Sequence, residues 1–252
     1  MTLYLIGLGL HDEKDISLKG LEVVRNCDTI YLENYTSVLQ CSVENLEKFY
    51  GKKITLCSRE QAEQGAEKIV EEARKNNIAF LVVGDPFSAT THVELFRLAK
   101  EKKVPVKVIH NASILTAVGI TGLQLYKFGR TTSIPFPEDV PEAETPYIVL
   151  KENQSSGLHT LFLLDLQPEH DRFLTISQAL QVLEKIEVKR QGGLITDSLL
   201  VVGCARLGSD DYLIKAGSVP EIKKINFGRP PYSLIIPGKL HFLEEEVLEF
   251  YR

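Results

Sequence analysis

Residues 79–92 read AFLVVGDPFSATTH, and they give the first indication of the architecture. The stretch starts with five apolar residues, breaks at Gly84-Asp85-Pro86 and continues into a Ser/Thr-rich segment that should begin a helix. A short apolar run, rich in branched residues and bounded by a Gly/Pro break, predicts a buried central strand of a parallel sheet. Ligands of open α/β sheets bind just beyond the carboxyl ends of such strands. We therefore expect Asp85 to lie where a ligand is met.

The residues before and after this stretch repeat its strand-then-helix pattern. Short apolar runs predict strands at 2–6, 29–33, 53–56, 79–83 and 104–109. Amphipathic segments between them predict helices, which we place from Asp15 onward and at 42–50, 58–75 and 91–102. A strict alternation of strands and helices is typical of a mostly parallel sheet that helices cover. An α/β domain is therefore expected for the first half of the chain.

The second half of the chain has different proportions. A polar, proline-bearing run at 136–146 predicts the domain boundary, so we expect an N-terminal α/β domain at 1–135 and a C-terminal mixed α/β domain at 136–252. The elements predicted after the boundary are helices at 147–156, 175–189 and 243–251 and strands at 158–166, 199–205, 212–216 and 232–236. The turn sequence GRPP at 228–231 favours antiparallel pairing of the last two strands.

Composition excludes several classes of protein. The 252 residues include 29 basic and 34 acidic side chains, for a net charge of −5, which argues against nucleic-acid binding driven by bulk charge. We expect no signal peptide, no membrane span and a cytoplasmic location. No cysteine lies in a CxxC pair, so neither a metal site nor a disulfide framework is expected from Cys27, Cys41, Cys57 and Cys204.

The first strand ends in a glycine loop that is only a weak ligand signal. Gly7 and Gly9 lie between a strand and a helix, where a dinucleotide loop would lie, but the third glycine is replaced by Asp12. A tight strand-to-helix turn explains the two glycines at least as well. The sequence contains no P-loop, no HExxH and no spacing that assembles a Ser/His/Asp triad. These absences favour chemistry done by positioning a reactive ligand.

Asp85 can be interpreted in two ways from its surroundings. Its carboxylate, at the end of a strand, could accept hydrogen bonds from a ligand, or it could cap the following helix. The same pair of alternatives holds for Ser113, and the strand ends at Asp165 and Arg206 need turns in any case. Strand ends from both halves could face one cleft, and clefts between domains are favoured ligand sites. These observations favour neither role of Asp85, ligand contact or helix cap, over the other.

Motifs along almost the whole chain resemble the diphthine synthase family, a group within the tetrapyrrole-methylase type of methyltransferase. The long block at 117–129 and the PGKLH segment are specific to that family, whereas the GLG and GDP elements are shared more widely. The segments that carry the resemblance are LYLIGLGL at 3–10, DISLKG at 15–20, GDP at 84–86, ATTH at 89–92, SI at 113–114, AVGITGL at 117–123, YKFG at 126–129, GLHT at 157–160 and PGKLH at 237–241.

This resemblance implies a two-domain, tetrapyrrole-methylase-like (class III) methyltransferase, with a mostly parallel N-terminal sheet and a mixed C-terminal sheet. S-adenosylmethionine would bind in the cleft between the domains. No catalytic residue is implied, and neither is a metal. The cofactor contacts that the resemblance implies are Leu10, Asp85, Ser88, Ser113, Ile114, Leu164, Leu207 and Tyr232.

The resemblance also implies a substrate and a partner. The reaction would be methylation of the amino group of the aminocarboxypropyl-histidine of translation elongation factor 2, giving diphthine. A homodimer is implied as well, and the apolar segment 115–125 is a candidate for its interface. A near alternative is a methyltransferase of the same fold that acts on a corrin precursor or on ribosomal RNA. A dehydrogenase and a non-catalytic nucleotide-binding protein are more distant alternatives, and the incomplete glycine motif argues against the dehydrogenase.

Overall fold

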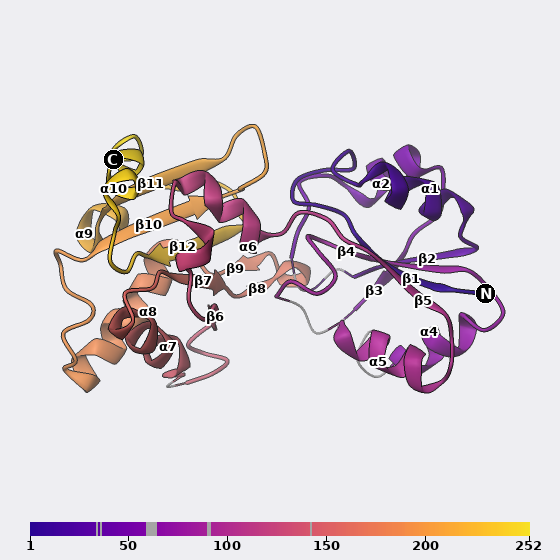
Figure 1. The fold of residues 1–252 in the computed structure, drawn as a ribbon, viewed down its shortest axis with the longest axis horizontal. Helices are drawn as coiled ribbons and strands as arrows, with labels where there is room; N and C mark the ends of the chain where they lie inside the picture. Colours follow the sequence, from indigo (N-terminus) through magenta and orange to yellow (C-terminus); the bar gives the residue numbers. More distant parts are fainter. Residues whose placement is uncertain (34, 36, 59–64, 90–91, 142) are drawn as a thin grey trace. The chain divides into compact units, whose positions relative to one another are not determined.

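The computed structural model describes residues 1–33, 35, 37–58, 65–89, 92–141 and 143–252. The chain forms two compact units, Met1–Ala117 and Val118–Arg252 (Figure 1). Each unit is an α/β structure that contains its own five-stranded sheet. Within the described ranges, no helix combines the length and the apolar character needed to cross a membrane.

The sheet of the first unit is entirely parallel, and its strand order is β3-β2-β4-β1-β5. All five residues of the central strand are buried, which confirms the strand predicted from the apolar run at 79–83. Because the strands are parallel, their carboxyl ends lie at one edge of the sheet. The strands are β1 (Leu3–Gly7), β2 (Thr29–Glu33), β3 (Thr55–Cys57), β4 (Ile78–Val82) and β5 (Val106–Ile109).

Helices cover both faces of this sheet (Figure 1). Successive side chains of β4 point to opposite faces, so Phe80 packs in the cluster with α4 and α5, while Leu81 packs in the cluster with α1 and α2. Burying one such side chain contributes about 1.5–3 kcal/mol to folding. A strand buried on both faces is therefore apolar at every position. The helices are α1 (Leu18–Asn26), α2 (Val43–Tyr50), α4 (Ala66–Glu72), α5 (Val93–Glu101) and α6 (Ile114–Ala117).

The sheet of the second unit is mixed, in the order β11-β10-β12-β7-β6. Only the pair of β6 and β7 is parallel, and the other neighbours are antiparallel. A small hairpin of β8 (Leu166–Gln167) and β9 (Arg172–Phe173) follows β7. The strands of the mixed sheet are β6 (Thr132–Ile134), β7 (Thr160–Leu164), β10 (Leu200–Ala205), β11 (Leu213–Ser218) and β12 (Tyr232–Ile236).

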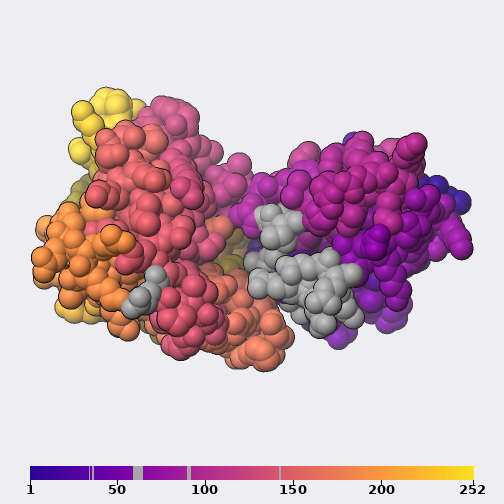
Figure 2. All heavy atoms as spheres, turned by 90° about the horizontal axis from the view of Figure 1, so that it is seen from below, coloured from indigo at the N-terminus to yellow at the C-terminus, as the bar shows by residue number. Residues whose placement is uncertain are grey.

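Helices lie on both sides of the mixed sheet as well. Figure 1 shows α7 and α8 on one side and α10 on the other. Figure 2 shows the C-terminal residues, in yellow, beside the magenta segment that opens the unit, and the hydroxyl of Tyr251 donates to the carbonyl of Ile120 at 2.7 Å. The helical elements are η1 (Val118–Thr121), η2 (Leu125–Lys127), α7 (Thr145–Ser155), η3 (Pro168–His170), α8 (Ile176–Arg190), α9 (Val219–Ile222) and α10 (Phe242–Glu249).

The division between the two units lies earlier than the boundary placed at 135/136. It falls between Ala117 and Val118, so residues 118–135 belong to the second unit. The reason is strand pairing, because Thr132, Ser133 and Ile134 pair with β7 and not with the first sheet. An extended segment before a proline-rich run has no local signal that tells which sheet it joins.

Three further expectations need correction. The strands at 212–216 and 232–236 do not pair with each other, because β10 lies between β11 and β12, and α9 separates them along the chain. Helix α1 is capped by Ser17, whose hydroxyl accepts from the amide of Gly20 at 3.1 Å, and not by Asp15. Helix α4 begins at Ala66 and ends at Glu72, so it is shorter than the helix predicted at 58–75, of which 59–64 lie outside the described residues.

Candidate functional site

The carboxylate of Asp85 is held at the end of β4 by its own loop and by the next one. Its Oδ1 accepts from the amide of Phe87 at 3.0 Å and from the hydroxyl of Ser88 at 3.3 Å. Its Oδ2 accepts from the amide of Asn111 at 3.2 Å and lies 2.8 Å from Nδ1 of His110. Burial opposes ionisation of this carboxyl, but these hydrogen bonds outweigh the burial and lower the pKa of Asp85. Asp85 is therefore an ionised, almost buried anchor of two loops.

The structure removes one of the two roles considered for Asp85. Helix α5 begins at Val93, and its N-cap position is His92, so Asp85 does not cap this helix. The carboxylate instead bonds the amide two residues later, which closes a local turn in the loop. The remaining role, that of a polar group at the ligand-binding edge of the sheet, is the one that the structure leaves open.

The glycine loop after β1 pairs with the loop of Asp85. The amide of Gly84 donates to the carbonyl of Gly9 at 2.7 Å, and the reverse bond is 3.3 Å long. Both glycines have a positive φ, of 84° and 80°, which is a conformation that other residues rarely adopt. A Cβ at Gly7 would lie 2.5 Å from the carbonyl oxygen of Gly84. The glycines are therefore required by the close approach of two loops.

Asn111 joins the third loop, after β5, to the glycine loop. Its Nδ2 donates to the carbonyls of Gly7 and Asp15, each at 3.0 Å. The Asp15 carboxylate in turn accepts from the amides of Leu10 at 3.0 Å and His11 at 2.8 Å. Asp15 thus holds the glycine loop and does not cap α1. Three loops at the carboxyl edge of the first sheet are hydrogen-bonded to one another.

These three loops and the start of α6 carry the five N-terminal residues that the resemblance singled out. Leu10 lies on the first loop, Asp85 and Ser88 on the second and Ser113 on the third, and Ile114 follows Ser113 as the first residue of α6. A Cβ at Gly84 would lie 3.9 Å from the Cα of Ser113, so the second and third loops are neighbours. The structure brings these residues together although they are far apart in the sequence.

The three C-terminal candidates lie at one edge of the second sheet. Tyr232 opens β12 and is paired with Ala205, the last residue of β10, and Leu207 follows two residues after Ala205. Leu164 ends β7, whose neighbouring residue Leu163 pairs with the residue after Tyr232. The ends of two strands and the start of a third therefore meet there.

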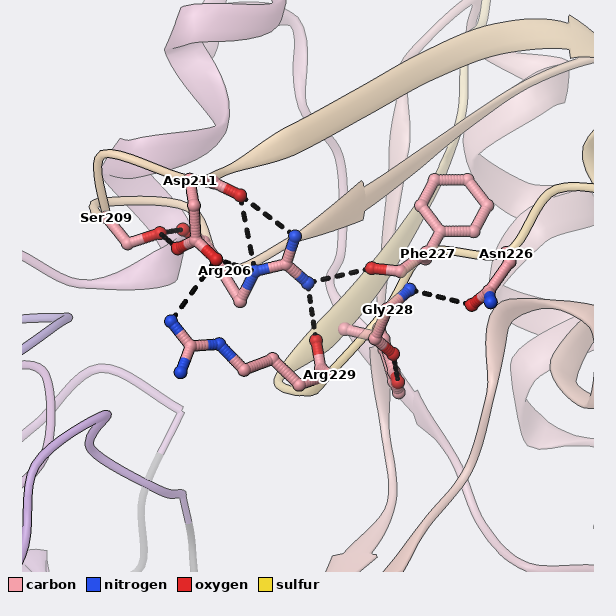
Figure 3. A network of polar contacts seen from close by, with 8 residues as sticks. Arg206, Ser209, Asp211, Asn226, Phe227, Gly228 and Arg229 are labelled. Atoms are coloured by element: carbon pink, nitrogen blue, oxygen red, sulfur yellow. Dashed lines mark hydrogen bonds and ion pairs between the residues drawn. The ribbon is translucent and has the colours of Figure 1, made fainter.

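A buried arginine organises this edge (Figure 3). The guanidinium of Arg206 donates through Nη1 to the carbonyls of Phe227 at 2.7 Å and Arg229 at 2.6 Å. Through Nη2 and Nε it reaches the carbonyl of Asp211 at 2.8 Å and its carboxylate at 3.1 Å. Arg206 is only 8% exposed and has a positive φ of 53°. It ties the loop that carries Leu207 to the turn before Tyr232.

Two polar residues of the first unit were not singled out from the sequence. His110 and Asn111 follow directly after β5, and both contact Asp85. Both residues directly follow a predicted strand of the parallel sheet, and this position is what also indicated Asp85. The sequence therefore contained a signal by which they could have been selected. The contacts themselves depend on β4 and β5 lying on either side of β1.

Comparison with known proteins agrees with this geometry. Residues 2–223 match the family model described as Tetrapyrrole (Corrin/Porphyrin) Methylases. The chain belongs to this family. Members of the tetrapyrrole methylases use S-adenosylmethionine as methyl donor, so the chain is a methyltransferase, and the expected fold class is confirmed.

Two curated relatives and one solved structure are similar over nearly their full length. A diphthine methyl ester synthase from Dictyostelium discoideum is 44% identical over 269 residues, covering 100% of this chain and 98% of the relative. A diphthine synthase from Methanocaldococcus jannaschii is 46% identical over 251 residues, covering 98% of each. A crystal structure of diphthine synthase matches with a TM-score of 0.91 at 38% identity, covering 100% of this chain and 96% of the other.

Proposed function

We propose that this chain is a diphthine synthase, which transfers methyl groups from S-adenosylmethionine to the amino group of the aminocarboxypropyl-histidine of translation elongation factor 2. The observation that carries the proposal is similarity at about 45% identity over the full chain to relatives named diphthine synthase or diphthine methyl ester synthase, together with the family motifs. The product is diphthine, in which repeated transfer leaves a trimethylammonium group.

The loops of the first unit form part of the proposed cofactor site. Its contacts there are Leu10, Asp85, Ser88, Ser113 and Ile114. The space beside Gly84 is not tightly filled, because a Cβ there would meet nothing closer than 3.9 Å. All four hydrogen-bonding directions of the Asp85 carboxylate have partners. A ligand donor would therefore take the place of the Ser88 hydroxyl, which makes the longest of these contacts.

The resemblance implies three further cofactor contacts in the second unit, at Leu164, Leu207 and Tyr232. Leu164 and Leu207 are apolar and almost buried, so they offer backbone groups and shape to a ligand, not charge. The buried guanidinium of Arg206 holds the backbone after Leu207 and before Tyr232 in place through the carbonyls that it bonds. A rigid edge lowers the entropy lost when a ligand binds.

Methyl transfer from a sulfonium depends more on how the two reactants are positioned than on chemical activation of either one. The cofactor supplies a methyl group on a sulfonium, which departs as a neutral thioether. The residues of the chain have to align the acceptor amine with this methyl group and keep the amine neutral. A positioned side chain that removes a proton typically contributes about 10²–10⁴-fold to such a rate.

The test is transfer of labelled methyl groups. The protein is mixed with methyl-labelled S-adenosylmethionine and with elongation factor 2 that carries the aminocarboxypropyl-histidine. Label on the factor supports the proposal, whereas label only on a corrin precursor or on ribosomal RNA supports the alternatives of the same fold. The mass of the modified peptide also tells whether an ester is formed, because relatives are named both diphthine synthase and diphthine methyl ester synthase.

Substitution of Asp85 tests the cofactor site. We expect Asp85→Ala to weaken binding of S-adenosylmethionine, because the variant loses a carboxylate that organises two loops of the site. Calorimetric titration measures the affinity, and circular dichroism checks that the variant is folded. Unchanged affinity in a folded variant would remove Asp85 from the proposed site.

The chain is further proposed to be a homodimer located in the cytoplasm. The segment before and within η2 exposes apolar side chains, of which Ile120 and Leu125 are 45% and 44% exposed and Tyr126 is 81% exposed. Phe250, which is 83% exposed, precedes the tyrosine that bonds the carbonyl of Ile120. A contiguous exposed apolar surface is typical of an interface. Sedimentation at micromolar concentration that finds only monomer would contradict the dimer.

A further inference from the structure

The histidine that contacts Asp85 combines an exposed ring with a buried partner. The side chain of His110 is 68% exposed, whereas that of Asp85 is 8% exposed, and His110 Nδ1 lies 2.8 Å from Asp85 Oδ2. The ring also meets the ring of Phe87 edge-on, with centroids 6.3 Å apart. The imidazole is therefore fixed on one side and open to solvent on the other.

The contact with Asp85 determines which nitrogen of the neutral ring carries the proton. The hydrogen bonds to Asp85 lower its pKa, so its carboxylate is ionised and can only accept a hydrogen bond. Nδ1 of His110 must therefore be the donor, which leaves the lone pair on Nε2. Nε2 makes no hydrogen bond to the described part of the chain. A carboxylate that orients an imidazole in this way is the arrangement by which histidine acts as a general base in other enzymes.

The position of His110 places this nitrogen among the proposed cofactor contacts. Its partner Asp85 is one of them, and Ser88 bonds the other oxygen of the same carboxylate. Ser113 follows His110 on the same loop. A base on these loops lies at the edge of the sheet where the methyl donor is proposed to bind.

We propose that His110 is the general base of the methyl transfer and that Asp85 orients it; this assignment rests on the proposed function. Nε2 takes a proton from the acceptor ammonium, and the freed nitrogen lone pair forms the new N–CH₃ bond. The bond between sulfur and the methyl carbon breaks, and its electron pair stays on sulfur. The imidazolium, held by the Asp85 carboxylate, passes its proton to water, because the ring is exposed. The same cycle precedes each transfer.

The decisive variant is His110→Asn. Its amide nitrogen can still donate to Asp85, but it provides no basic nitrogen in place of Nε2. We expect kcat to fall about 100-fold, the lower end of the range for general bases, while the affinity for S-adenosylmethionine stays within about twofold. The pH profile of kcat should lose an ionisation that the wild-type protein shows. Free imidazole should restore part of the rate of His110→Ala, because it can occupy the space and accept the proton.

Controls separate this role from others. His170→Ala, at an exposed histidine of the second unit, should leave kcat unchanged. An unchanged kcat in folded His110→Asn would overturn the assignment, and so would a loss of activity that is fully explained by weaker cofactor binding. Wild-type protein that transfers no label to the modified elongation factor would instead overturn the proposed function, and the role of His110 with it.

Discussion

Glu244 of α10 is a fully buried carboxylate, and its removal is a sharp test of how the second unit is held together. It accepts from the amides of Gln124 at 2.9 Å and His241 at 2.7 Å, and from Nε2 of His159 at 3.0 Å. The ammonium of Lys127 donates to it as well. These partners come from segments that carry the family resemblance, at 117–129, 157–160 and 237–241. One carboxylate therefore joins three distant parts of the chain.

The ionisation of Glu244 is strongly coupled to folding. Burial alone would raise its pKa, but the hydrogen bonds from Lys127, the two backbone amides and His159 outweigh this and lower the pKa from 4.5 to about 2. The difference corresponds to about 3 kcal/mol of stability at neutral pH. Because the pKa of Glu244 is lower in the folded state, its full contribution to stability is present when the pH is well above the ordinary pKa of 4.5. It is lost as the pH falls from about 4.5 through about 2.

We expect Glu244→Gln to lower the free energy of unfolding by about 3 kcal/mol near pH 7, because the partly buried ammonium of Lys127 loses its counter-charge. At about pH 3 the variant and the wild type should differ by only roughly 1 kcal/mol in the free energy of unfolding. At that pH the wild-type carboxylate has lost most of its contribution to stability. Urea denaturation followed by circular dichroism at the two pH values measures both numbers.

The neighbouring exposed residue supplies the control. Glu245→Gln removes the same charge from the same helix, and Glu245 is exposed, so its effect should stay within about 0.5 kcal/mol at either pH. A Glu244→Gln difference that is the same at both pH values would refute the coupling between ionisation and folding. A difference below about 0.5 kcal/mol near pH 7 would refute the role of the buried cluster altogether.

Three further substitutions probe the loops and the helix contact. Asn111→Ala leaves two backbone carbonyls without their donor, so we expect a loss of about 1–3 kcal/mol in stability and about tenfold weaker binding of S-adenosylmethionine by calorimetry. Arg206→Lys cannot reproduce the forked donors, and the cofactor KM should rise more than kcat falls, as steady-state kinetics would reveal. Gly122→Ala would bring a Cβ to 2.3 Å from Val247, so it should lower the melting temperature more than Gly51→Ala, which is equally strained in φ but meets nothing within 4 Å.

The strongest local patterns in the sequence predicted their elements well. The apolar run at 79–83 corresponds to the central strand β4, and the strand predicted at 232–236 has the bounds of β12. Helix α8 has Thr175 as its N-cap, in a capping box with Gln178. Such signals depend on neighbours along the chain, so they can be read without knowing the fold.

Strand pairing was the part that local patterns could not predict. β11 and β12 appeared to form a hairpin, yet β10 separates them in the sheet. The segment before β6 carried no sign of which sheet it joins, and this shifted the predicted boundary from 117/118 to 135/136. Pairing partners are selected by packing between residues distant in sequence, where a local turn signal has little weight.

The amino-acid sequence by itself determined the parallel sheet of the first unit, the place of Asp85 at the end of its central strand, and, through the motifs, the kind of enzyme. Only the tertiary structure decided what Asp85 touches. His110 lies 25 residues later in the chain, and it meets Asp85 because β4 and β5 flank β1 with all carboxyl ends at one edge. Glu244 and His159 are 85 residues apart and meet only when α10 packs onto the second sheet. Hydrogen bonds between residues so distant depend on the folded backbone, and no local pattern records them.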